Sequence, residues 1–137
     1  MAVFNNSDEL HRVMVDLWTA IKNDKDMAQA LLSSRLTVQF HYREPDGRLT
    51  VDCSDGETMH IYAGECDKKP VVEMFMKSDV AHEFWLGKVN VPLALIQGKI
   101  VSKGPVNKAL ALLPAIKPAY GIYPSVIAKN GLKVSIS

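Results

Sequence analysis

Apolar residues recur at helical spacing in the first part of the chain. With 3.6 residues per turn they form one stripe, made of Leu10, Val13, Met14, Leu17, Trp18 and Ile21. Ser7 is placed to cap this helix, and Asp8 and Glu9 follow where negative charge is favourable beside the helix dipole. The stripe stops near Lys22-Asn23, and a shorter helix is predicted over Asp26–Leu32.

The apolar period then changes to two, which is typical of strands with one buried face. Alternation with polar residues is clearest at Leu36, Val38, Phe40 and Tyr42. The turn signal Pro45-Asp46-Gly47 separates this strand from a second one at Arg48–Asp52. Two further strands are predicted at Thr58–Tyr62 and Val71–Met76. The last of these is apolar on both faces, so we expect it inside the sheet rather than at an edge.

The segment from Ser78 to Pro114 has a glycine or proline near each change of element. A helix is predicted up to Gly87, and Asn90 is placed to cap a short apolar helix that ends before Gly98. An alternating run over Lys99–Lys103 predicts a fifth strand. The glycine and proline after it open a further helix.

The composition is ordinary for a soluble globular protein, with 47% hydrophobic and 23% charged residues in 137. A net charge of +1 argues against nucleic acid as a partner. No internal repeat or low-complexity linker is visible, so residues 1–137 are predicted to form a single domain. Cys53 and Cys66 match no zinc spacing, and we expect free thiols in a reducing cytoplasm. The N-terminus does not resemble a signal peptide, and the longest apolar run, Val91–Ile96, is too short to cross a bilayer.

Signatures of catalysis are missing from the sequence. The histidines on predicted strands, His41 and His60, have no carboxylate at the spacing of a metal ligand. Cys53 follows Asp52, whose charge raises the pKa of a neighbouring thiol and makes it a poor nucleophile. There is no Gly-x-Ser-x-Gly elbow. We therefore expect no catalytic residue, no metal and no cofactor.

Two glycine-bounded motifs carry a resemblance to a known family. Gly87-Lys88-Val89-Asn90-Val91-Pro92 leads into an apolar turn, and Gly98-Lys99-Ile100-Val101-Ser102-Lys103-Gly104 is a strand closed by a second glycine. Following a helix and a four-stranded meander, this order resembles the sterol carrier protein 2 family from the first helix to Pro118. The resemblance implies an α+β fold, with a five-stranded, mostly antiparallel sheet covered by helices and an apolar tunnel between them. It also implies non-enzymatic binding or transfer of a sterol, a fatty acid or a fatty acyl-CoA.

A set of apolar residues is predicted to bind the ligand in this tunnel. Taken alone, such residues are more often ordinary core, because buried apolar side chains usually only pack. The resemblance favours a lined cavity, and flexible methionines suit ligands of varied shape. The predicted residues are Phe40, Met59, Ile61, Met74, Met76, Phe84, Trp85, Leu93, Ile96, Leu110, Leu113 and Ile116.

The size of such a cavity has an energetic consequence. A pocket of roughly 400 Å³ is mid-range for small-molecule sites. Left unfilled at roughly 24 cal/mol per Å³ it would cost about 10 kcal/mol, which is comparable to the whole stability of about 5–15 kcal/mol of a domain. We therefore expect that the protein carries a lipid when purified, or that its helices collapse inward. Pro114, Pro118 and Pro124 are expected to break the apolar tail into short pieces, and the stretch from Pro114 to Ile127 is expected to act as a mobile lid.

Two other functional classes stay open. A small enzyme acting on steroids or acyl thioesters would need a perturbed carboxylate or tyrosine in the cavity, and Tyr42 and Glu73 are the nearest candidates. An interaction module would use its apolar surface to bind a partner enzyme of lipid metabolism. The expected partner is a lipid or a sterol-like small molecule, with transient membrane contact as a further option.

Overall fold

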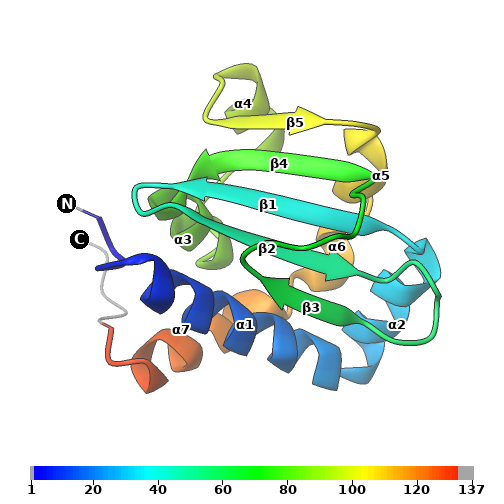
Figure 1. The fold of residues 1–137 in the computed structure, drawn as a ribbon, viewed down its shortest axis with the longest axis horizontal. Coiled ribbons are helices and arrows are strands. Elements are labelled where there is room, and N and C mark those ends of the chain that lie inside the picture. Colours follow the sequence, from blue (N-terminus) through cyan, green and yellow to red (C-terminus); the bar gives the residue numbers. More distant parts are fainter. Residues whose placement is uncertain (1, 133–137) are drawn as a thin grey trace.

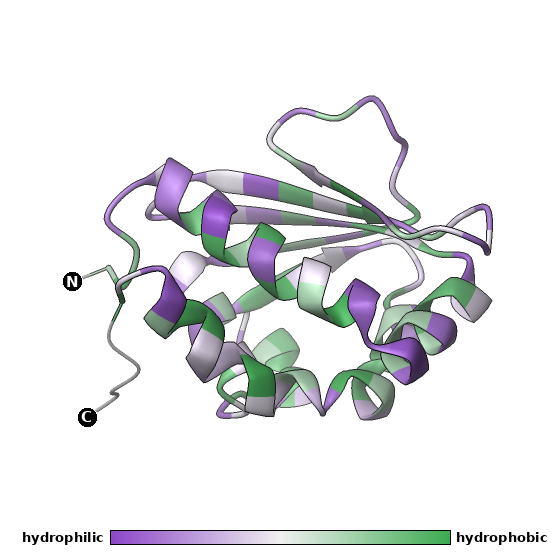
Figure 2. Ribbon diagram, turned by 90° about the horizontal axis from the view of Figure 1, so that it is seen from below, coloured by the Kyte–Doolittle hydropathy of each residue, from purple (hydrophilic) through white to green (hydrophobic). Residues whose placement is uncertain are grey.

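An open sheet with helices gathered mainly on one side forms the structure, a computed structural model that describes residues 2–132 (Figures 1 and 2). The alternating segments of the sequence are its strands, and the segments of helical period are its longer helices. In chain order the elements are α1 (Ser7–Asn23), α2 (Lys25–Ser34), β1 (Thr37–Arg43), β2 (Gly47–Asp52), β3 (His60–Ala63), β4 (Val72–Lys77), α3 (Ser78–Trp85), α4 (Val91–Ile96), β5 (Ile100–Lys103), α5 (Val106–Leu110), α6 (Leu113–Ile116) and α7 (Ala119–Lys129).

The sheet has five strands in the order β3-β2-β1-β4-β5. β1 pairs in parallel with β4, whereas the other three neighbouring pairs are antiparallel. The expected four-stranded meander is therefore wrong in its last strand, because β4 lies beside β1 and not beside β3. The predicted α+β class with a mostly antiparallel sheet is therefore confirmed. β4 lies between β1 and β5, as its two apolar faces predicted. The parallel pair forms because the long connection from β3 to β4 crosses the sheet before β4 begins (Figure 1).

The apolar stripe of α1 is buried against β2, β3 and α7, as its period predicted. The cap differs by one residue from the prediction. Asn6 Oδ1 accepts a hydrogen bond from the backbone N–H of Glu9 at 2.8 Å, so Ser7 is already the first helical residue. Asp24 caps α2 in the same way, through the backbone N–H of Met27 at 3.0 Å. Asparagine, aspartate and serine are all good caps, so the sequence alone does not choose between Asn6 and Ser7.

The β3–β4 connection arches over the sheet face away from the helices (Figure 2), and buried polar side chains lie on that face. Thr37 Oγ1 donates to Asp52 Oδ1 at 2.8 Å, and Gln39 Nε2 donates to Thr50 Oγ1 at 2.9 Å, with all four residues buried. Lys68 Nζ of the connection lies 3.7 Å from Asp52 Oδ2. Because these polar groups bond to one another, this face needs no helix to cover it. The cavity lined by Phe40, Met74 and Met76 lies on the other face.

The segment from Ser78 to Pro114 folds in the predicted order of helix, short helix, strand and helix. Asn90 Oδ1 accepts a hydrogen bond from the backbone N–H of Leu93 at 3.1 Å and thereby caps α4. Gly104 ends β5 with a φ of 89°, and a β-carbon at this position would collide with the carbonyl oxygen of Val71. Glycine is required here because both the left-handed backbone and the close approach exclude a side chain.

The C-terminal helix α7 is part of the core. Tyr123, Val126 and Ile127 are buried, and α7 packs against α1 and α3. Pro124 lies inside this helix and does not end it, contrary to the expectation that the prolines would divide the tail into short pieces. Pro118, in contrast, immediately precedes α7 and separates it from α6.

Membrane crossing was tested by length and composition. Among residues 2–132 no single helix is long and apolar enough for a transmembrane span. Segments Val106–Ile116 and Ala119–Lys129 meet the two criteria only when taken together, and they are bent by 81° relative to each other.

Candidate functional site

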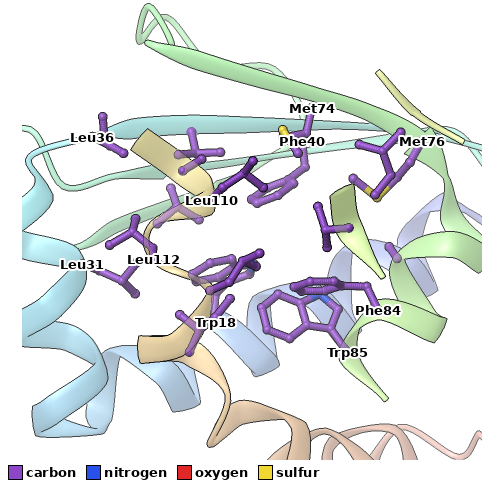
Figure 3. Close-up of a pocket in the computed structure, with 18 of the residues that line it drawn as sticks. Trp18, Leu31, Leu36, Phe40, Met74, Met76, Phe84, Trp85, Leu110 and Leu112 are labelled. Atoms are coloured by element: carbon purple, nitrogen blue, oxygen red, sulfur yellow. The ribbon is translucent and has the colours of Figure 1, made fainter. Parts of the chain in front are cut away.

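A cavity of about 100 Å³ lies between the sheet and the helices. Figure 3 shows its labelled side chains approaching the same space from both layers. The strands contribute Val38, Phe40, Tyr42, Val51, Met74, Met76 and Ile100. The helices and connections contribute Trp18, Leu31, Ser34, Leu36, Cys53, Ala81, Phe84, Trp85, Val91, Ala109, Leu110, Leu112, Leu113 and Ile116.

The residues on the sheet side of the cavity can be derived from the alternation of side chains along each strand. Val38, Phe40 and Tyr42 point to the same face of β1. The parallel register places Phe40 beside Met74 and Tyr42 beside Met76. Two adjacent strands thereby present one continuous apolar surface to the helices.

Aromatic side chains form the helix side of the cavity. Trp18 of α1 lies with its ring centroid 5.8 Å from Phe40 and 5.5 Å from Trp85, the latter pair edge to face. Phe84 packs edge to face against Trp85 at 4.8 Å and against Tyr120 at 5.7 Å. Edge-to-face contacts at these distances are favourable beyond the area that they bury. The cluster therefore packs α1, β1, α3 and α7 against one another on this side of the cavity.

The segment formed by α5 and α6 is the least firmly packed wall. No residue of α5 is fully buried, and Leu110, Leu112 and Leu113 are half-buried although all three line the cavity. The lid predicted over Pro114–Ile127 is thus misplaced, because its second half is the buried helix α7. Ile116 is the one fully buried residue within α5 and α6.

The cavity is smaller than the roughly 400 Å³ expected from ligand sites in general. At roughly 24 cal/mol per Å³, about 100 Å³ corresponds to about 2.4 kcal/mol instead of about 10 kcal/mol. A domain of ordinary stability tolerates this smaller penalty.

Most of the predicted ligand-binding residues lie around the cavity. Those that line it are Phe40, Met74, Met76, Phe84, Trp85, Leu110, Leu113 and Ile116. Four do not. Met59 is buried just before the edge strand β3, and Ile61 lies on β3, which α1 covers. Leu93 and Ile96 are 46% and 82% exposed, because α4 turns Val91 and Ala94 inward and therefore these two outward.

Several lining residues were missed by the sequence analysis. Val38 and Tyr42 share the alternation of Phe40, and this signal was sufficient to find them. Trp18 was predicted only as part of the apolar stripe of α1. No sequence signal separates it from its neighbours in the stripe, because an apolar side chain has the same spacing whether it faces another side chain or a cavity.

Few polar groups face the cavity. Burial raises the pKa of the Tyr42 hydroxyl well above its usual range, with nearby Tyr123 adding to the rise, so this hydroxyl is protonated at neutral pH. Burial, together with Asp52 and Asp55, raises the pKa of the Cys53 thiol to about 11. The indole N–H of Trp18 is buried without a hydrogen-bond partner among the described residues.

The carboxylate considered for an enzyme lies elsewhere. Glu73 is on the opposite face of the sheet, where its Oε1 is 3.0 Å from His41 Nε2. Within residues 2–132, none of the residues that line the cavity is a carboxylate, and no group of three or more His, Cys, Asp or Glu side chains is arranged to hold a metal ion. The arrangement is therefore suited to enclosing apolar groups and offers neutral hydrogen-bond donors.

An apolar cavity enclosed between an open mixed sheet and a layer of short helices defines the class of the protein, a small α+β domain built around a hydrophobic pocket. The model of the SCP-2 sterol transfer family matches residues 17–117, and the chain belongs to this family. Lipid binding or transfer is the general property of that family. No curated protein matches the chain in sequence.

Solved structures share the fold. The sterol carrier protein domain 2 of Helicoverpa armigera is 23% identical, with a TM-score of 0.68 over 88% of this chain and 96% of that one. Sterol carrier protein 2 of Yarrowia lipolytica is 16% identical, with a TM-score of 0.59 over 82% and 88%. The sec-alkylsulfatase Pisa1 of a Pseudomonas species is 17% identical, with a TM-score of 0.50 over 83% of this chain but 17% of that chain. The fold therefore occurs both as a separate protein and as part of an enzyme.

Proposed function

We propose that this chain, acting as a single domain, binds a sterol, a fatty acid or a fatty acyl-CoA in the cavity and carries it without chemical change. The observation that carries the proposal is the continuous apolar wall of β1, β4 and α3, closed by the weakly packed segment α5–α6. Membership of a family whose general property is lipid binding or transfer supports it.

Uptake of such a ligand requires the cavity to grow. Small-molecule sites typically measure roughly 300–1,000 Å³, several times the present volume of about 100 Å³. We propose that α5 and α6 swing outward, while the aromatic wall of Trp18, Phe40 and Trp85 stays in place. Gly104 and Pro105, between β5 and α5, are the hinge. The side chains of Met74 and Met76 adapt to the ligand, because methionine has several accessible rotamers.

The direct test is displacement of a fluorescent fatty-acid analogue by unlabelled fatty acids and sterols, in solution without vesicles. Leu112→Glu places a carboxylate in the cavity wall, and Ala111→Glu places the same charge on the neighbouring exposed position. We expect Leu112→Glu to weaken binding by at least tenfold, because a buried carboxylate costs several kcal/mol. Ala111→Glu should bind like the original protein. Equal affinities for both variants would show that the ligand does not use this cavity.

A second candidate is a hydrophobic-ligand module that works beside an enzyme. The similarity to a sec-alkylsulfatase, of which the match covers 17%, favours this alternative. Affinity purification of the chain from its native source, with lipid extraction of the same sample, distinguishes the two. A stoichiometric enzyme without lipid supports the module, and lipid without an enzyme supports the carrier.

Turnover of the ligand is the feature that would contradict a carrier. Tyr42 and Cys53 are cavity residues whose pKa is raised by burial, so both stay protonated at neutral pH. Incubation with steroid enones and acyl thioesters, followed by mass spectrometry, should return the substrates unchanged. Product that disappears in the variant Tyr42→Phe would make the protein an enzyme.

We also propose a cytoplasmic location. Cys53 and Cys66 are both free thiols, and Cys66 is only half-buried. A reducing compartment keeps such thiols free. Cell fractionation, combined with alkylation of Cys66 before lysis, tests this, and an oxidised Cys66 in a secreted fraction would contradict it.

A further inference from the structure

The short helix α4 presents apolar side chains to solvent. Val91 and Ala94 turn inward and are buried, whereas Leu93 and Ile96 lie three residues apart on the outer side and are 46% and 82% exposed. Ile96 is the most exposed large hydrophobic residue of the described chain. Single exposed apolar residues are common, so its meaning depends on what surrounds it.

Basic side chains surround this helix. A shallow hollow of about 570 Å³ beside α4 is lined by Arg43, Lys77, Lys88 and Lys99, with Glu83 as its acidic member. All four basic residues are exposed. Lys77 Nζ lies 3.7 Å from Glu44 Oε2, outside the hollow, and the other three basic residues have no ion pair within residues 2–132. With Glu83 and Glu44 included, this region has four basic and two acidic residues. Its local positive charge is therefore larger than the net charge of the entire chain, which is +1.

We propose that this basic apolar face docks on an anionic phospholipid bilayer. The face consists of Arg43, Lys77, Lys88, Leu93, Ile96 and Lys99. Leu93 and Ile96 would enter the interface between headgroups and acyl chains, and the cations around them would lie against lipid phosphates. The proposal deepens the proposed function, because it names the surface through which a lipid carrier meets its lipid source.

The make-up of the face favours a bilayer over a protein partner. Lysine is depleted at protein interfaces, whereas aromatic residues are enriched there. This face has three lysines and no aromatic residue. Its apolar part consists of two side chains on one short helix, which is little for a stable protein contact. Mobile lysines around a small apolar tip are instead suited to a fluid surface of negative charge.

The docking helix is also a wall of the cavity. Val91 of α4 lines the cavity together with Ile100 of β5 and Phe84 of α3. Insertion of Leu93 and Ile96 would pull α4 toward the bilayer and away from these two residues. The docked protein would then open its cavity toward the acyl chains from which a ligand is taken.

The test is co-sedimentation of the full chain with vesicles of phosphatidylcholine alone or with about one third phosphatidylserine. We expect binding to the anionic vesicles and little to the neutral ones. Lys88→Ala/Lys99→Ala should weaken binding by about twenty-fivefold, since each lysine near an anionic surface contributes about fivefold. Ile96→Asp should weaken it by at least tenfold. The matched control Lys22→Ala/Lys25→Ala changes exposed lysines at the α1–α2 corner, far from α4, and should bind like the original (Figure 1).

Insertion of the tip is measured separately with an environment-sensitive dye. In the variant Cys66→Ser/Ile96→Cys the new thiol is exposed, whereas the remaining Cys53 is only 2% exposed. The dye emission should shift to the blue with anionic vesicles, and the same dye at Thr19→Cys should not respond. Equal binding to neutral and anionic vesicles, binding unchanged in the lysine variant, or an unshifted dye would each overturn the proposal.

Vesicle binding tests the docking face, and fatty-acid binding in solution tests the cavity, so the two hypotheses can fail separately. The lysine and Ile96 variants should bind the fluorescent fatty acid in vesicle-free solution with unchanged affinity, since none of these residues lines the cavity. Loss of vesicle binding with intact ligand binding supports the docking face. Intact vesicle binding in every variant overturns the docking face and leaves the cavity hypothesis standing.

Discussion

Filling the cavity with a larger side chain tests whether the space between the sheet and the helices is a real binding site. Ala81 on α3 is 2% exposed and lines the cavity. In the variant Ala81→Leu three carbon atoms enter a space of about 100 Å³. We expect the variant to be more stable than the original protein and to lose ligand binding. This combination would not arise from damage to the fold.

The magnitude follows from two independent estimates. Removing a cavity of about 100 Å³ recovers up to about 2.4 kcal/mol at roughly 24 cal/mol per Å³. Burying three methylene-sized groups at about 0.8 kcal/mol each also gives about 2.4 kcal/mol. Fixing the leucine rotamer costs about 0.5–1 kcal/mol, which leaves a gain of about 1.5 kcal/mol. For a chain of this length the midpoint of thermal unfolding should rise by about 5 °C.

The assay pairs urea unfolding with displacement of the fluorescent fatty acid. Ala128→Leu makes the same change at an exposed position of α7 and should alter neither stability nor affinity by much. A variant Ala81→Leu that is destabilised by more than about 1 kcal/mol and still binds the fatty acid would refute the reasoning. That result would mean that the space is already filled and that ligands bind elsewhere.

Two further predictions concern stability. Gly104→Ala should lower the free energy of unfolding by about 3 kcal/mol or more, because the new β-carbon meets the carbonyl of Val71. Gly98→Ala has a φ of 76° and open space around it, so it should lose only about 1–2 kcal/mol in the same urea titration. Equal losses in the two variants would contradict this reasoning. His82 Nδ1 lies 2.7 Å from the Tyr123 hydroxyl, and burial lowers the pKa of His82 below its usual 6.5 although Asp79 opposes the shift. The unfolded chain therefore binds the proton more readily, so stability is fully present above about pH 6.5 and decreases as the pH falls below that value. His82→Gln, which retains an acceptor for Tyr123, should show a smaller decrease in unfolding experiments at several pH values, and an identical pH dependence in both proteins would assign the effect to another group.

Local patterns predicted most of the elements. The helical stripe of α1 and the alternation of β1 each have one dominant period, and both elements formed as expected. The capping side chain of Asn90 and the glycine at Gly104 act through contacts close by in the fold. Where the prediction was off, as at Asn6 and Pro124, two local solutions have similar free energies and the packing of a helix against the core selects one.

The candidate site was predicted only in part, for a physical reason that Ile96 and Met74 illustrate. Both are apolar residues in apolar segments, yet Met74 lines the cavity and Ile96 is 82% exposed. On β4 the period of two and the parallel register with β1 settle the direction of Met74. The six residues of α4 are all apolar, so its sequence does not mark an outer side. Only the position of β5 against the helix decides which side faces outward.

The sequence by itself determined the order of helices and strands as far as α5, the resemblance to a lipid-carrier family, and the lack of a charged group suited to catalysis among the residues predicted for the site. These features depend on local period, on turn residues and on residue type, all of which can be read along the chain. The tertiary structure decided the parallel pairing of β1 with β4, the volume of the cavity, the shallow burial of α5 and the outward face of α4. These depend on which distant segments meet, and an apolar side chain follows the same pattern whether it packs against protein, lines a cavity or faces a membrane.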